Sequence, residues 1–256
     1  MPCSRASIRG RSGRLFCTGW KPVTRERCLV TGFQPVSKCT CEYLQTMDLF
    51  GDDLYFDEHG EIHVQQRNLP HWKQEGKLYF LTWRLADSLP QEQLAQLDAD
   101  RAAWVRRHGT ALVRHLSPAL REEWYNLFHR RVQRWLDAGY GSCVLKHPEA
   151  MRIMVDSLHF FEGQRYRLGS FAIAGNHVHV LVAPLVGIDL SDVLHSWKSF
   201  TGNAINKAIG QRGRLWMDEN FDRLVRDAEH LNRIEAYIAR HEHQGAHVEL
   251  RDLFNP

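Results

Sequence analysis

Two histidines separated by one residue are the first candidates for chemistry in this sequence. His177 and His179 lie in the run Asn-His-Val-His-Val-Leu-Val at 176–182. Residues i and i+2 of a β-strand point to the same face, so two imidazoles there can bind one metal ion. Because the chain has 15 histidines in 256 residues, about one His-x-His is expected by chance, and His241-Glu242-His243 is a second. The alternative is a pair of histidines on an exposed sheet face.

A tyrosine and a histidine near the end of the chain could add a nucleophile and a third ligand. Tyr237 and His241 are four residues apart, so on a helix they lie one above the other. A helix packed across the histidine strand would bring both to the metal. A tyrosine hydroxyl has a pKa of roughly 10, but a nearby cation favours the phenolate and polarises a phosphate. The alternative is that Tyr237 ends an apolar stripe and His241 is solvated.

The segment from His195 to Trp216 combines cations with aromatic rings and holds no Asp or Glu. Cations for phosphates together with aromatic faces for bases are typical of single-strand nucleic-acid binding. The alternative is an amphipathic helix followed by a basic loop.

The apolar pattern predicts the sheet and the helices that must position these groups. Gly175-Asn176 indicates a tight turn between two strands, and Asp227 begins the last helix. The expected strands are 78–85, 167–174, 177–183 and a short 221–225; the expected helices follow Pro148, cover 189–209 and start at Asp227. This order predicts an α+β, ferredoxin-like (βαββαβ) antiparallel sheet with an added C-terminal helix.

A helical insertion of about 90–145 interrupts this order after the first strand. Ser88 and Pro90 favour a helix start, and Ser117-Pro118 favours a second one. Apolar residues recur at intervals of three and four until Gly139 and Gly141 break the pattern. The sequence leaves open whether the insertion is a lid or a further DNA-binding surface.

Charge and cysteine are concentrated at the start of the chain. The net charge of +3 divides into +6 over residues 1–46 and −3 over the rest, and Cys143 is the one cysteine beyond the first 46 residues. We expect 1–46 to be a basic, cysteine-containing, disordered extension and 47–256 to be the domain. No apolar run approaches the roughly 18 residues of a membrane span, and no secretion signal begins the chain, so we expect a cytoplasmic protein without a membrane partner.

Taken together, these residues resemble the IS200-like and REP-associated tyrosine transposases. Asn176–Val182 is similar to their HUH motif (His, hydrophobic, His), and Arg233–Ile238 is similar to their catalytic-tyrosine helix. The resemblance covers roughly 66–243 and includes 69–72, 79–85, 135–141, 196–201, 215–216 and 221–227. It implies a nucleoid-associated bacterial enzyme that acts on hairpin-containing single-stranded DNA at repetitive palindromic elements.

The resemblance also implies a role for each candidate residue. His177, His179 and His241 would hold Mg²⁺ or Mn²⁺, and Tyr237 would form a 5′-phosphotyrosine intermediate. The implied DNA contacts are Trp197, Lys198, Arg212, Arg214, Trp216, Arg223 and Arg226. The sequence leaves open whether a homodimer forms and whether Tyr237 serves its own subunit or a partner.

One departure concerns the position four residues after the tyrosine, where the family usually has Asn or Gln and this chain has His241. Histidine is a better ligand for softer divalent ions, so the site is expected to prefer Mn²⁺ to Mg²⁺, or to bind Zn²⁺ and stall. Two alternatives to the transposase stay open: a non-catalytic nucleic-acid-binding module of the same fold and a hydrolytic metalloenzyme.

Overall fold

The structure is a computed structural model that describes residues 54–66, 70–109 and 117–253. The chain divides into two units, Met1–Met47 and Asp48–Pro256, and the described residues belong to the second. The predicted disordered extension at 1–46 therefore lies outside the described residues.

Five strands form the central sheet. Along the chain the elements are β3 (Tyr79–Leu85), α4 (Pro148–His159), β4 (Tyr166–Ile173), β5 (His177–Pro184), α5 (Leu190–Ala208), β6 (Trp216–Leu224), α6 (Ala228–Arg240) and β7 (His247–Glu249). The order across the sheet is β6-β3-β5-β4-β7, and every neighbouring pair is antiparallel. The first four strands have the ferredoxin-like order, and β7 adds a fifth at the edge. The predicted fold class is confirmed.

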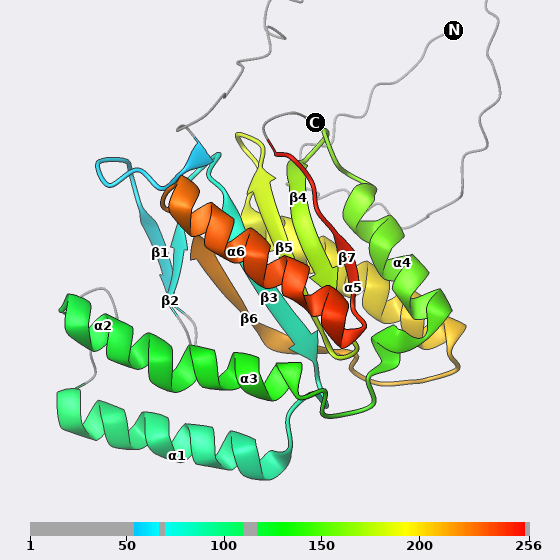
Figure 1. Ribbon diagram of the computed structural model, residues 1–256, viewed down its shortest axis with the longest axis horizontal. Coiled ribbons are helices and arrows are strands. Elements are labelled where there is room, and N and C mark those ends of the chain that lie inside the picture. The colour runs from blue at the N-terminus through cyan, green and yellow to red at the C-terminus, as the bar shows by residue number, and fades with distance from the viewer. Residues whose placement is uncertain (1–53, 67–69, 110–116, 254–256) are drawn as a thin grey trace, which may run out of the picture. The chain divides into compact units, whose positions relative to one another are not determined.

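Helices cover both faces of this sheet (Figure 1). On one face α4 and α5 pack against β3, β4 and β5 through a cluster that includes Trp83, Met154, Val180 and Trp197. On the other face α6 packs through its predicted stripe of Leu231, Ile234 and Ile238. Because β5 is covered on both faces, all of its residues are buried.

The helical insertion is confirmed and consists of two helical segments. The first is α1 (Gln91–His108); the second runs through α2 (Pro118–Trp124), a π-helical stretch η3 (Tyr125–Arg130) and α3 (Arg131–Asp137). Leu97, Trp104 and Phe128 form the buried contact between the two segments. Each segment thus has its apolar face covered by the other, which is how a short helix pair becomes stable.

Local signals at the start of the last helices were predicted well, whereas one helix start was not. Asp189 accepts a hydrogen bond from the Ser191 N–H (2.6 Å) before α5, and Asp227 accepts one from the His230 N–H (2.6 Å) before α6. The helix start predicted from Ser88 is wrong, because no N–H of α1 donates to a capping side chain and the Ser88 hydroxyl instead donates to the Leu85 carbonyl (2.7 Å).

The sequence pattern also missed or shortened some strands. Strand β6 begins at Trp216 and not at Phe221, because it pairs with β3 alone and its free edge accepts the polar run 218–220. A separate antiparallel pair, β1 (His63–Gln66) and β2 (Pro70–Lys73), precedes the sheet. Short 3₁₀ turns are η4 (Val144–Lys146) and η5 (His241–Gln244).

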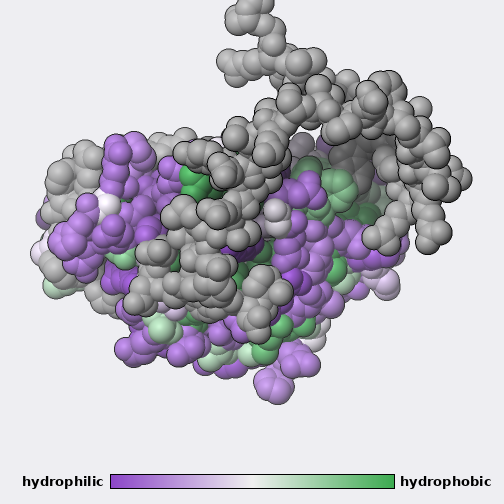
Figure 2. Space-filling model, turned by 90° about the horizontal axis from the view of Figure 1, so that it is seen from above, coloured by the Kyte–Doolittle hydropathy of each residue, from purple (hydrophilic) through white to green (hydrophobic). Residues whose placement is uncertain are grey.

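Figure 2 shows one face of the molecule. On the face drawn in Figure 2, hydrophilic residues predominate and hydrophobic side chains occur in small separate groups. Within the described part of the chain, no helix has the length and hydrophobicity that a bilayer span requires.

Candidate metal centre and tyrosine

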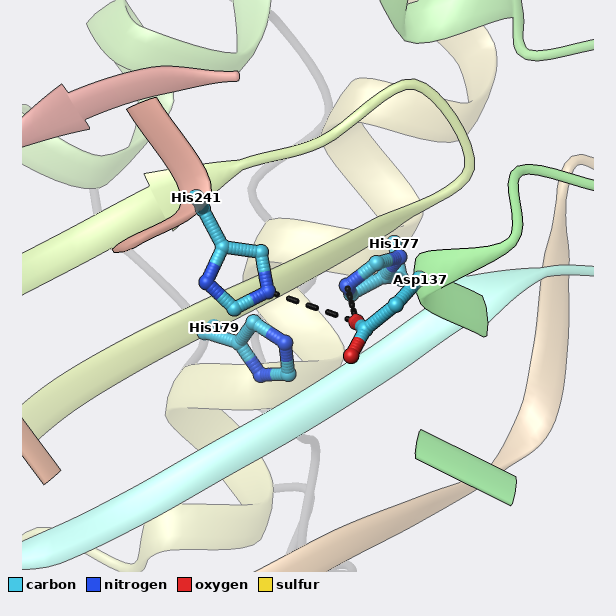
Figure 3. A group of neighbouring side chains, drawn as sticks. All are labelled: Asp137, His177, His179 and His241. Atoms are coloured by element: carbon cyan, nitrogen blue, oxygen red, sulfur yellow. Dashed lines mark ion pairs between the residues drawn. The ribbon is translucent and has the colours of Figure 1, made fainter. Parts of the chain in front are cut away.

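Three imidazoles converge on the α6 face of the sheet (Figure 3). His177 and His179 project from β5, and their ring centroids lie 4.6 Å apart. His241 is the first residue of η5, directly after α6, and its ring lies 4.7 Å from that of His179. Two segments far apart in the sequence thus bring the three predicted histidines together in one chain.

Each ring is held at its Nδ1 atom, which turns Nε2 toward the centre. His241 Nδ1 donates to the Tyr237 carbonyl oxygen (2.9 Å), and His177 Nδ1 donates to the Asn176 side-chain oxygen (2.7 Å). His179 Nδ1 lies 2.8 Å from the Thr82 hydroxyl, directly across the β3–β5 ladder. A neutral ring that donates from Nδ1 presents a lone pair at Nε2, the arrangement found in metal-ligating histidines.

A fourth group, Asp137 at the end of α3, completes the cluster. Its Oδ1 atom lies 3.4 Å from His241 Nε2 and 3.7 Å from His177 Nε2. The four donor atoms of Asp137 and the three histidines all lie within 4.8 Å of one another. The helical insertion therefore contributes directly to the site, and Figure 3 shows the carboxylate between the rings.

The unpaired atoms of this cluster fit a bound cation. Within the described part of the chain, Asp137 Oδ1, His177 Nε2 and His241 Nε2 are buried without a hydrogen-bond partner. Buried acceptors that face one another are costly unless a proton or a cation lies between them. Three imidazoles and a carboxylate are a donor set for zinc, manganese or iron, whereas Mg²⁺ prefers oxygen ligands.

Burial keeps the strand histidines neutral. It lowers the pKa of His177 to about 3, although the charge of Asp137 acts in the opposite direction. Burial also lowers the pKa of His179 well below its ordinary value, and the neighbouring His177 and His241 lower it further. Neutral imidazoles are the form that binds metal, so protons would compete weakly with a cation for these two rings.

Tyr237 stands beside the histidines. Its hydroxyl oxygen lies 3.3 Å from His179 Nε2 and donates a hydrogen bond to Gln133 Oε1 of α3 at 3.1 Å. Phe80 stacks on the His179 ring and meets the Tyr237 ring edge-on, which fixes both side chains. Burial raises the pKa of the Tyr237 hydroxyl, and the charge of Asp137 raises it further. The phenol therefore stays protonated unless positive charge is brought to the site.

A cleft of about 690 Å³ opens beside Tyr237 between the insertion and α6. Its charged lining residues are one carboxylate, Asp137, and five arginines: Arg130, Arg134, Arg223, Arg233 and Arg240. Burial lowers the pKa of His129, which also lines the cleft, to about 3, and the charges of Arg223 and Arg130 lower it further. The arginines of the cleft thus disfavour an additional positive charge on His129.

The predicted DNA contacts are divided between two regions. Arg223 lines the cleft beside Tyr237, and Arg226 lines the adjoining cavity of about 1260 Å³ between the insertion and the sheet. Lys198 and Arg214 line a separate cavity between α5 and β6, and Arg212 is exposed in the loop between these elements. The histidines and Tyr237 lie across the sheet from α5, so these last three residues do not adjoin the cluster.

The two tryptophans predicted to contact DNA belong to the core. Trp197 is 1% exposed, stacks on Trp83 and donates to the Tyr166 hydroxyl. Trp216 is 5% exposed and donates to the Thr201 hydroxyl. The prediction that these rings stack on bases is wrong, because aromatic residues interleaved with cations also arise when one face of a helix packs against a sheet.

Asp137 and Gln133 are site residues that sequence reasoning missed. They are four residues apart on one helical segment, and both point at the cluster. Asp137 comes just before Gly139 and Gly141, which predict the end of the helix. No sequence signal near Asp137 predicts that its side chain contacts the histidines of β5.

Comparisons with known proteins add a structural similarity but no match to a family model or a curated protein. A solved structure of a REP-associated tyrosine transposase bound to a REP hairpin is similar over 71% of this chain and 74% of that chain, with 11% identity and a TM-score of 0.38. The fold assignment rests on the strand order of the chain itself.

Proposed function

We propose that the protein is a metal-dependent transesterase that cleaves and rejoins hairpin-containing single-stranded DNA with Tyr237 as its nucleophile. The observation that carries the proposal is the position of the Tyr237 hydroxyl, 3.3 Å from His179 Nε2. Tyr237 and the three histidines lie close together in one chain, which supports a reaction at a centre within a single subunit. The hairpin substrate follows the family resemblance of the sequence.

The proposed reaction exchanges one phosphodiester for another. The Tyr237 oxygen attacks phosphorus, a bond from this oxygen to phosphorus forms, and the bond from phosphorus to the 3′ oxygen breaks. The phenol proton passes to the departing 3′ oxygen, which leaves as a free 3′-OH. A 3′-OH of another strand reverses the step, and no external energy source is needed because the phosphotyrosine retains the bond energy.

Four side chains would hold the divalent cation: His177, His179, His241 and Asp137. A cation bound there would polarise the scissile phosphate and favour ionisation of the phenol. The chain itself opposes that ionisation, since burial and Asp137 raise the pKa of Tyr237. Gln133 holds the hydroxyl in place by accepting its hydrogen bond. With three nitrogen donors the centre favours Mn²⁺ over Mg²⁺.

A covalent adduct with a defined polarity tests the proposal. Hairpin oligonucleotides with randomised single-stranded flanks are incubated with protein and Mn²⁺, and the products are separated on a denaturing gel. A 3′ label should migrate with the protein, whereas a 5′ label should appear in a shorter free oligonucleotide. Tyr237→Phe should abolish the adduct, and Tyr140→Phe, which changes an exposed tyrosine, should not.

Two other outcomes would overturn the proposal in different directions. Cleavage without adduct would identify a hydrolytic metalloenzyme. Binding without cleavage, unchanged by Tyr237→Phe, would identify a non-catalytic nucleic-acid-binding module.

A further inference from the structure

The helical insertion forms one wall of the arginine-lined cleft, and α6 forms the opposite wall. Arg130 and Arg134 come from the insertion, and Arg233 and Arg240 come from α6. Arg223 of β6 completes the lining. Positive charge therefore reaches the cleft from three elements that are distant in the sequence, which a single amphipathic helix face would not produce.

Asp137 is the one carboxylate among the described residues that line the cleft, and it forms no ion pair with Arg134, Arg223 or Arg233. Among the described residues no ion pair is formed by Arg134, and Arg233 pairs with Glu229, which is outside the cleft lining. The guanidinium group of Arg223 lies 4.8 Å from the centre of the Tyr125 ring. Contacts with an aromatic face hold a guanidinium group in position without neutralising its charge.

Aromatic groups adjoin the cations. Tyr125 and His129 line the cleft, and the His129 ring stacks on Phe221 of β6. Both lining rings belong to the π-helical stretch η3, a feature often found at functional sites. Because His129 stacks on Phe221 and a guanidinium group lies over Tyr125, these rings fix the wall of the cleft and hold its cations in place.

We infer that the insertion and α6 together form a binding cleft for the sugar–phosphate backbone of single-stranded DNA, with Arg130 and Arg134 of the insertion as phosphate contacts. The cleft leads to the Tyr237 hydroxyl, which lies among its lining residues. The inference rests on the proposed function for the identity of the strand, and it gives the insertion the role of a DNA-binding surface. Backbone contacts of this kind position a strand and carry no sequence information.

Salt-dependent binding of an unstructured oligonucleotide tests the inference. Fluorescence anisotropy with labelled dT20 is measured in the Tyr237→Phe background, so that binding is separated from cleavage. Single-stranded binding loses about 0.7 in the slope of log K against log salt for each phosphate contact removed. The double variant Arg130→Gln/Arg134→Gln should therefore lower the slope by about 1.4 and weaken binding about 10- to 30-fold at 0.1 M salt.

The chain offers a matched control in the same insertion. Arg106 and Arg107 are exposed in the last turn of α1 and do not line the cleft. The double variant Arg106→Gln/Arg107→Gln removes the same charge and should leave affinity and slope unchanged. Arg130→Lys/Arg134→Lys should restore the slope, and thermal melting confirms that each variant is folded.

The inference would be overturned by equal losses in the two double variants, by no loss in either, or by no binding of dT20 by the parent protein. A duplex of the same length that competes as well as dT20 would also overturn it. Failure of the proposed function can be distinguished from failure of this inference. If no covalent adduct forms but Arg130→Gln/Arg134→Gln selectively loses affinity for dT20, the cleft binds single-stranded DNA and the proposed cleavage reaction is wrong.

Discussion

Asp137 Oδ1 lies 3.4 Å from His241 Nε2, although one residue ends the helical insertion and the other follows the C-terminal helix. Both atoms are buried and lack a hydrogen-bond partner within the described residues. Two acceptors at this distance repel each other unless something positive lies between them. A cation or a proton between Asp137 and His241 would offset this repulsion, and the two possibilities lead to different predictions.

Asp137→Asn should raise the stability of the metal-free protein and lower its affinity for metal. The amide can donate to His241 Nε2 or His177 Nε2, so in EDTA the variant should gain about 1 kcal/mol in the free energy of unfolding. Its affinity for Mn²⁺ should fall at least about tenfold, since even groups behind the ligands contribute that much. Urea unfolding and titration calorimetry measure the two effects.

Glu92→Gln changes an exposed carboxylate at the start of α1 and is the control. Destabilisation of metal-free protein by Asp137→Asn would instead mean that Asp137 pairs with a protonated histidine.

Metal removal should lower the stability of the folded domain. A ligand present at 100 times its dissociation constant stabilises the folded state by about 2.7 kcal/mol, so the thermal midpoint should rise with Mn²⁺ and return with EDTA. His241→Ala should abolish the rise. His243→Ala, an exposed histidine two residues away, should retain it, and equal behaviour of the two variants would exclude His241 as a ligand.

Two buried threonines allow metal binding to be separated from stability. Thr82→Val leaves His179 Nδ1 without its partner at 2.8 Å and should cost about 1–3 kcal/mol of stability and about 10- to 100-fold in metal affinity. Thr201→Val removes the 2.9 Å hydrogen bond of Trp216 on the opposite face of the sheet. Thr201→Val should lower the free energy of unfolding by a similar amount and leave the metal affinity unchanged. If it lowers the metal affinity as much as Thr82→Val does, the loss is a general effect of destabilisation.

Acid should destabilise the metal-free protein through His177. Its pKa is about 3 in the folded chain and about 6.5 when unfolded, so between these values the unfolded state binds more protons. The free energy of unfolding therefore falls as the pH falls from about 6.5 toward 3. His177→Gln should lose less stability between pH 7 and 5 than the parent, measured by urea unfolding in EDTA. His195→Gln, exposed on α5, should keep the parental dependence.

The site residues that were predicted from the sequence alone were all found by geometric rules that relate neighbouring positions in the chain. The spacing of His177 and His179 places them on one face of a strand, and the spacing of Tyr237 and His241 places them on one face of a helix. The strand order across the sheet followed from the alternation of strand and helix patterns. These rules act within a few residues, and for that reason they could be read from the chain.

What sequence could not supply depends on packing between distant segments. Asp137 reaches the histidines because the insertion packs over the sheet, and no spacing along the chain encodes that contact. Trp197 illustrates the opposite error, since a ring beside Lys198 suits a nucleic-acid surface as well as a core. Only the face of α5 that packs on the sheet decides between the two.

If a cation binds at the proposed centre, Asp137 couples its binding to the packing of the insertion against the sheet. If the cation binds more tightly when the insertion is seated, then the cation must hold the insertion in place by the same factor. A ligand that displaces α3 would consequently lower the affinity for the ion, and removal of the ion by a chelator would weaken the packing of α3. Exchange of hydrogen for deuterium at the amides of Arg131–Asp137 should thus report the occupancy of a centre formed mostly by other parts of the chain.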